Sequence, residues 1–89
     1  MRASNLCALP STLDLIDSEL DRARTKFPGN THLTHALTEE VGELAKAQLQ
    51  RRPRSEVVAE AVQVACLAIR IIEEGDADFA AITDAEAKT

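Results

Sequence analysis

The chain has no tryptophan and no tyrosine, and Phe27 and Phe79 are its only phenylalanines. Its apolar surface must therefore come mostly from leucine, isoleucine, valine and alanine, a mixture that suits packed helices. An excess of positive charge is also missing, because the formal net charge is -5 at pH 7. This acidity argues against attraction to nucleic acid or to an anionic membrane surface.

Long apolar runs and cysteine pairs are missing as well. No segment approaches the roughly 20 uninterrupted apolar residues of a membrane span, and the apolar run within residues 1–10 is too short for a secretory leader. Cys7 and Cys66 stand far apart and form no CxxC motif, which indicates free thiols in a reducing compartment. We therefore expect a cytoplasmic protein without a membrane partner.

The length of 89 residues leaves room for a single domain, residues 1–89, and 45% of the residues are hydrophobic. The core of so small a domain is marginal. Helices with more apolar surface than one short chain can cover usually pair with a second copy. We expect a homodimer or homotetramer.

Apolar residues recur at spacings of three and four, the pattern of amphipathic helices. Pro53 can end one helix and open the next, Asn30 or Thr31 can cap the second, and Asp76 can cap the last. The chain is thus predicted to form an all-α bundle of three long helices and a short C-terminal one. Their approximate ranges are 11–27, 31–51, 54–74 and 78–88.

The third predicted helix is unusually apolar. Between residues 57 and 72 only Glu60, Gln63 and Arg70 are not hydrophobic. Apolar side chains surround most of its circumference, so this helix is expected to lie at the centre of the bundle. At 100° per residue the three polar side chains share one stripe.

Three acids crowd the second predicted helix: Glu39, Glu40 and Glu43 share one face. In an antiparallel pairing the stripe of the third helix, with Glu56 and Glu60, comes opposite them. Facing carboxylates need a cationic partner, and Mg²⁺ prefers oxygen ligands of this kind. Solvated acids that make ordinary helical pairs are the alternative. The retention of polar side chains on an otherwise apolar helix favours the metal.

The sequence EEVGE at 39–43, followed 17 residues after Glu43 by Glu60, resembles the EExxE and ExxD motifs of the MazG-like nucleotide pyrophosphohydrolases. The resemblance covers roughly residues 31–75. It implies an all-α fold and Mg²⁺, with Mn²⁺ as a substitute. Glu40, Glu43 and Glu60 would be metal ligands, and Glu39 would orient an attacking water. The implied reaction converts a nucleoside triphosphate into a monophosphate and pyrophosphate.

Gln63 stands where the family pattern usually has aspartate. Its amide oxygen can also coordinate Mg²⁺, but with one negative charge fewer. The resemblance therefore leaves two functions open: an active pyrophosphohydrolase with Glu39 and Glu43 as catalytic acids, or a MazG-like helical module that is weakened or inactive and serves in binding or assembly.

Positive side chains are expected to meet the substrate phosphates. Arg70 is the first candidate, with an ion pair to Glu74 as an equal alternative. Lys46 is the second, with an ion pair to Glu43 as its alternative. The basic connector at 51–54 could reach the phosphates bound to a neighbouring subunit, or could simply be solvated.

Overall fold

A computed structural model describes residues 10–88, and throughout that range every regular element is a helix. The elements are α1 (Pro10–Lys26), α2 (Leu33–Leu49), α3 (Arg54–Glu74) and α4 (Asp84–Ala87). The predicted all-α class is confirmed, and the three long helices lie close to their predicted bounds. Within residues 10–88, no helix has the length and apolarity that are needed to cross a bilayer. Cys7 lies outside the described residues.

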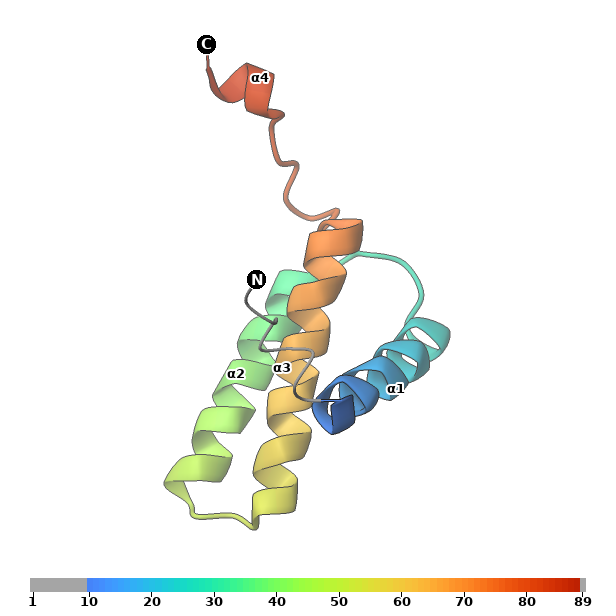
Figure 1. Cartoon of the computed structure of the whole chain (residues 1–89). Helices are drawn as coiled ribbons and strands as arrows, with labels where there is room; N and C mark the ends of the chain where they lie inside the picture. Colours follow the sequence, from blue (N-terminus) through green and yellow to red (C-terminus); the bar gives the residue numbers. More distant parts are fainter. Residues whose placement is uncertain (1–9, 89) are drawn as a thin grey trace, which may run out of the picture.

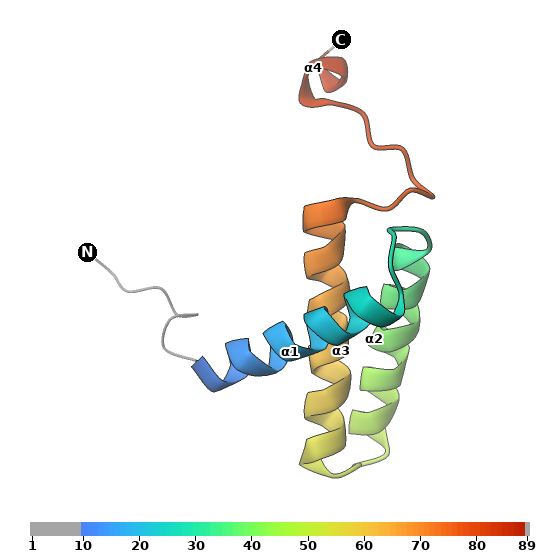
Figure 2. The ribbon, with the colours of Figure 1, turned by 90° about the vertical axis from the view of Figure 1, so that its right-hand side faces the viewer.

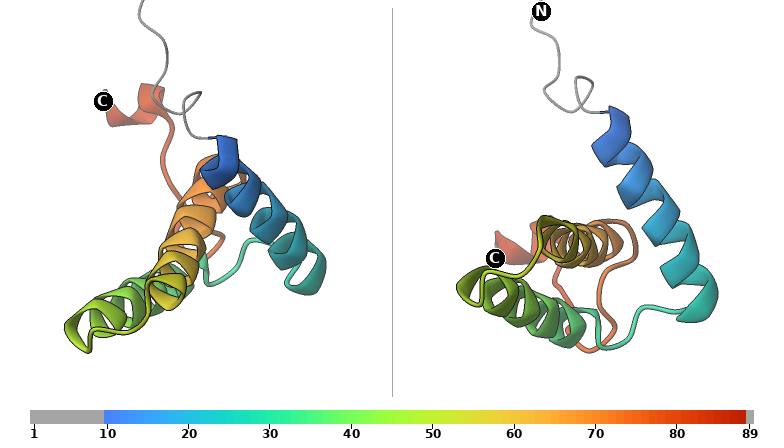
Figure 3. Two further views of the ribbon diagram at one scale, coloured as in Figure 1. Left: turned by 60° about the horizontal axis from the view of Figure 1, so that its bottom comes forward. Right: turned by 90° about the horizontal axis from the view of Figure 1, so that it is seen from below.

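Helix α3 lies at the centre of the fold. It runs antiparallel to α2, while α1 crosses it obliquely (Figures 1 and 2). For residues 10–88, α1 packs against α3 and not against α2, and Figure 3 shows α1 set apart from α2. The antiparallel pair and the central third helix agree with the prediction from the apolar circumference of residues 57–72.

The core is small. Among residues 10–88 the buried apolar residues are Leu33, Ala47 and Cys66, and the last of these is only 1% exposed. The Cys66 thiol donates a hydrogen bond of 3.5 Å to the backbone carbonyl of Ile16, which joins α3 to α1. Burial raises the pKa of this thiol. Several large apolar side chains stay exposed: Leu13, Leu15, Phe27, Val41, Leu49, Ile72, Phe79 and Ile82.

Arg70 fixes the connection between α1 and α2. Its side chain is buried, and Nη2 donates to the carbonyl oxygens of Phe27 at 2.9 Å and Gly29 at 2.7 Å. Nε lies 3.4 Å from a carboxylate oxygen of Glu74. Gly29 has a φ of 88°, a conformation that glycine adopts without a steric cost. The connection is thereby tied to the last turns of α3.

The start of α2 is capped from a distant part of the chain, which corrects the predicted capping by Asn30 or Thr31. The carboxylate of Asp76 accepts a hydrogen bond of 2.7 Å from the backbone N–H of Thr34. The Asn30 side chain instead donates to the carbonyl of Glu74 at 2.8 Å. Sequence spacing cannot predict such a cap, because its two partners are 42 residues apart.

The C-terminal helix is shorter than the predicted range 78–88. It covers Asp84–Ala87. Thr83 caps its start, because the Thr83 hydroxyl accepts a hydrogen bond of 3.1 Å from the backbone N–H of Glu86. The preceding residues are held at the start of α2, because Asp78 contacts His32 at 2.6 Å. The Ala77 backbone N–H also donates to the carbonyl of Asn30 at 3.0 Å, and the segment then leads away from the bundle to α4 (Figure 1).

Candidate metal centre

The pairing of α2 with α3 brings acids from both helices together. Glu39, Glu40 and Glu43 share a face of α2 because, at 100° per residue, their directions span only about 100°. The antiparallel partner places Glu60 opposite Glu40, close enough for the pKa of Glu40 to respond to the Glu60 carboxyl group. Both side chains are half-buried, whereas Glu39 and Glu43 are exposed.

The charge at this meeting point is not neutralised. Burial, the hydrogen bond with Glu60 and the negative charges of Glu60, Glu43 and Glu39 together raise the pKa of Glu40 to about 7. No arginine or lysine within residues 10–88 forms an ion pair with Glu40 or Glu60. At neutral pH a proton or another cation is therefore needed to relieve the repulsion.

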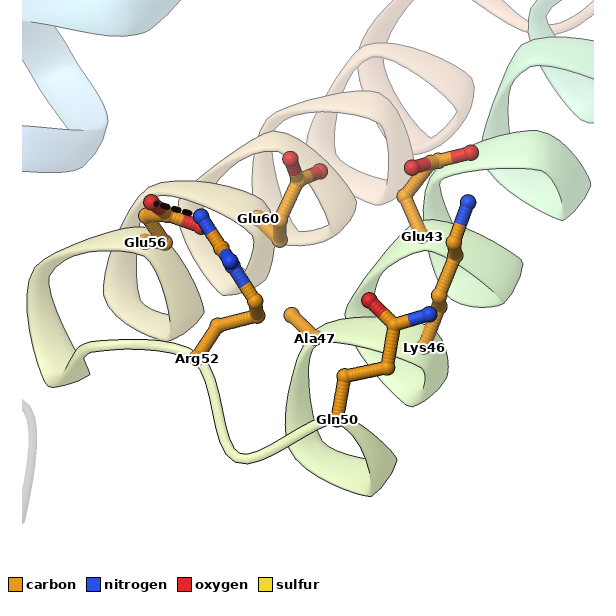
Figure 4. A pocket seen from close by; sticks show the side chains of 7 residues that line it. All are labelled: Glu43, Lys46, Ala47, Gln50, Arg52, Glu56 and Glu60. Carbon is orange, nitrogen blue, oxygen red and sulfur yellow. Dashed lines mark hydrogen bonds and ion pairs between the residues drawn. The ribbon is translucent and has the colours of Figure 1, made fainter.

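A cavity of about 110 Å³ lies between α2 and the start of α3, and Glu43 and Glu60 line it whereas Glu39 and Glu40 do not. Figure 4 shows the carboxylates of Glu43 and Glu60 on opposite walls, with the Lys46 ammonium group on the same wall as Glu43. Drug-sized ligands usually occupy about 300–1,000 Å³. The cavity is thus of a size for an ion or for phosphoryl groups rather than for a whole nucleotide.

Arg52 lies at the end of the same cavity and pairs with Glu56. Its Nε and Nη2 atoms donate to the two carboxylate oxygens at 2.8 and 2.9 Å. This hydrogen bonding lowers the pKa of Glu56. Helical periodicity alone does not predict this ion pair, because Pro53 lies between the two residues. The spacing of four residues is nevertheless the sequence signal that could have revealed it.

Gln63 faces the other side of α3. It lines a groove between α1 and α3 together with Glu19 and Arg22. The Arg22 guanidinium, followed by a hydrogen bond from Gln63, lowers the pKa of Glu19. The Gln63 amide therefore lies at the contact with α1. Glu60, three residues earlier, lines the cavity beside α2.

The two proposed phosphate-binding cations have different surroundings. Arg70 is 3% exposed and donates to backbone carbonyls, and its predicted ion pair with Glu74 is present. Lys46 is exposed and lines the acidic cavity. Of the two, Lys46 is placed to meet a ligand beside Glu43 and Glu60.

The fit of a divalent cation can be judged from the donor set. Within the described range, no three His, Cys, Asp or Glu side chains are arranged as a ready-made metal site. Magnesium seldom needs such a cage, since one or two carboxylates, water and substrate phosphates usually complete its shell. Glu40 and Glu60 supply two adjoining carboxyl groups, which fits a cation that arrives with its substrate.

Comparison with known proteins adds no relative. No protein-family model, curated protein or solved structure matches the chain.

Proposed function

We propose that this protein is a Mg²⁺-dependent nucleoside triphosphate pyrophosphohydrolase similar to the MazG-like family. The observation that carries the proposal is the meeting of Glu40 and Glu60 between two packed helices. Glu43 lies nearby, and no cationic side chain of residues 10–88 pairs with Glu40 or Glu60. Burying like charges without a partner costs stability, so a site for a cation offers a reason to retain them.

In this proposal Glu40, Glu43 and Glu60 hold Mg²⁺, or Mn²⁺ in its place. The bound ion would polarise phosphoryl oxygens and lower the pKa of a coordinated water. Glu39 is exposed on the same helix face and would orient the attacking water. Glu43 would be the second catalytic acid as well as a metal ligand. Lys46 neutralises phosphate charge that the metal does not cover. The proposal includes a cytoplasmic location, because nucleoside triphosphates are abundant in the cytoplasm.

The proposal leaves Gln63 and Arg70 outside the reacting groups. Gln63 supports the contact between α1 and α3 through Glu19, and Arg70 supports the connection between α1 and α2. This placement is the observation in favour of the second candidate, a MazG-like module that binds nucleotide or assembles without hydrolysis. A site with three carboxylates and no fourth acid could bind a metal more weakly.

We also propose that the protein forms a homodimer or homotetramer. A second groove between α1 and α3, distinct from the one that Gln63 lines, is lined by apolar side chains, Leu15, Ile16, Val58 and Val62 among them. The cavity beside the acids is too small for a base and sugar as well as phosphates. A second copy would cover apolar surface and could enlarge the site.

The decisive experiment incubates the purified protein and Mg²⁺ with a panel of canonical and modified nucleoside triphosphates and measures pyrophosphate release. We expect release that is lost in Glu43→Ala and retained in Asp17→Asn, an exposed acid on α1. A folded protein that releases no pyrophosphate from any member of the panel would favour the binding module.

A further inference from the structure

The connector between α2 and α3 places one arginine at the acidic cavity. Arg52 lines it together with Glu43, Lys46 and Glu60, whereas Arg51 and Arg54 do not. In Figure 4 its side chain extends from the connector toward α3 and meets Glu56. The cavity therefore has carboxylates on opposite walls and a guanidinium group at one end.

The pair formed by Arg52 and Glu56 is open to solvent. The two side chains are 51% and 46% exposed, and exposed pairs contribute little to stability because water and salt compete with them. Fixing the connector thus does not require this pair. Two parallel hydrogen bonds, 2.8 and 2.9 Å long, join the Arg52 guanidinium to the two carboxylate oxygens of Glu56. They orient two N–H donors of Arg52 toward a pair of oxygen atoms.

A phosphoryl group presents oxygen atoms to arginine in the same paired manner as a carboxylate. We propose that Arg52 binds the terminal phosphate of a triphosphate in the cavity of its own subunit, and that Glu56 occupies the guanidinium until the phosphate replaces it. This inference rests on the proposed function for the position of the substrate. It adds a residue that recognises the end of the phosphate chain.

The exchange has a direct consequence for affinity. Glu56 competes with the ligand, so its carboxylate weakens phosphate binding for as long as Arg52 is present. Removing the competitor should tighten binding, and removing Arg52 should weaken it. If the two residues act through one contact, the effect of changing Glu56 should vanish once Arg52 is gone.

The experiment measures binding of inorganic tripolyphosphate with Mg²⁺ by calorimetry at pH 7.5. We expect Arg52→Gln to weaken binding about tenfold or more, as for loss of a charge-assisted pair of hydrogen bonds. Glu56→Gln should tighten it about threefold or more, and the double variant should match Arg52→Gln. Arg54→Gln, with the same charge change outside the cavity, is the matched control, and circular dichroism checks that each variant is folded.

The outcomes separate this inference from the proposed function. Equal affinity in wild type, Arg52→Gln and Arg54→Gln, or no tripolyphosphate binding at all, would overturn the role of Arg52. Pyrophosphate release from nucleotides with an unchanged KM in Arg52→Gln would also overturn it and leave the enzyme intact. The expected binding pattern without pyrophosphate release from any nucleotide would support the phosphate site and contradict the hydrolase.

Discussion

Replacing Glu40 with glutamine should stabilise the metal-free protein at alkaline pH. In the folded chain the pKa of Glu40 is raised from 4.5 to about 7 by burial, by the hydrogen bond with Glu60 and by the neighbouring acids. The folded state therefore holds this proton more tightly than the unfolded state. Below pH 4.5 both states are protonated; as the pH rises toward 7 the unfolded chain ionises first, and the free energy of unfolding falls.

The magnitude follows from the two pKa values. A factor of ten in proton affinity corresponds to about 1.4 kcal/mol, so a rise from 4.5 to about 7 sets an upper limit of roughly 3.5 kcal/mol. Solvent screens a half-buried carboxyl group, and we therefore expect a loss of about 1–2 kcal/mol in wild type between pH 4.5 and pH 8. In Glu40→Gln this loss should be absent.

Urea denaturation followed by circular dichroism, in the presence of a chelator, measures the free energy of unfolding at each pH. Glu40→Gln should exceed wild type by about 1–2 kcal/mol at pH 8 and approach it at pH 4.5. Asp17→Asn changes the net charge equally at an exposed site on α1 and should leave the pH dependence as in wild type. A Glu40→Gln variant that loses as much stability as wild type over this range would refute the reasoning.

Three further substitutions test other parts of the structure. Arg70→Ala should lower the free energy of unfolding by about 2 kcal/mol or more in urea denaturation, because it removes two charge-assisted hydrogen bonds from a buried guanidinium to the carbonyls of Phe27 and Gly29; a loss below about 1 kcal/mol would contradict the role of this side chain. Asp76→Ala should speed hydrogen exchange of the Thr34 amide, and unchanged exchange would show that the cap is unimportant. Burial would raise the pKa of Asp76, but backbone hydrogen bonds from Thr34 and Asp78 lower it overall, so the stabilisation by Asp76 should persist above pH 3.8 and be lost only in stronger acid. Gln63→Asp should leave Mg²⁺ affinity within about threefold of wild type, since the side chain faces Glu19; a large gain would assign it to the metal site.

The long helices could be predicted because their causes are local. Apolar spacing and Pro53 determine where α2 ends and α3 begins, and the apolar circumference of α3 predicts its central position. The cap on α2 could not be predicted, because Asp76 reaches Thr34 only after α3 has folded back along α2. For the same reason, local periodicity does not reveal that Ala77 bonds to Asn30 and that Asp78 contacts His32, two contacts that join the residues before the last helix to the start of α2.

The candidate site was predictable in part. Helical geometry places Glu39, Glu40 and Glu43 on one face, and antiparallel pairing brings Glu60 to them. The position of Gln63 depends on where α1 crosses α3, which periodicity does not specify. The burial of Arg70 depends on the path of the connection between α1 and α2. Tertiary packing therefore determines which neighbouring element such polar side chains of α3 contact.

The most direct test of the central claim, that Glu40, Glu43 and Glu60 hold a divalent cation with its triphosphate, is a calorimetric titration. Mg²⁺ is added at pH 7.5 to wild type, Glu60→Gln and Asp17→Asn, with and without a non-hydrolysable nucleoside triphosphate analogue. We predict that the analogue strengthens Mg²⁺ binding in wild type and Asp17→Asn, and that Glu60→Gln weakens binding by about tenfold or more. Equal Mg²⁺ affinity in wild type and Glu60→Gln would contradict the account.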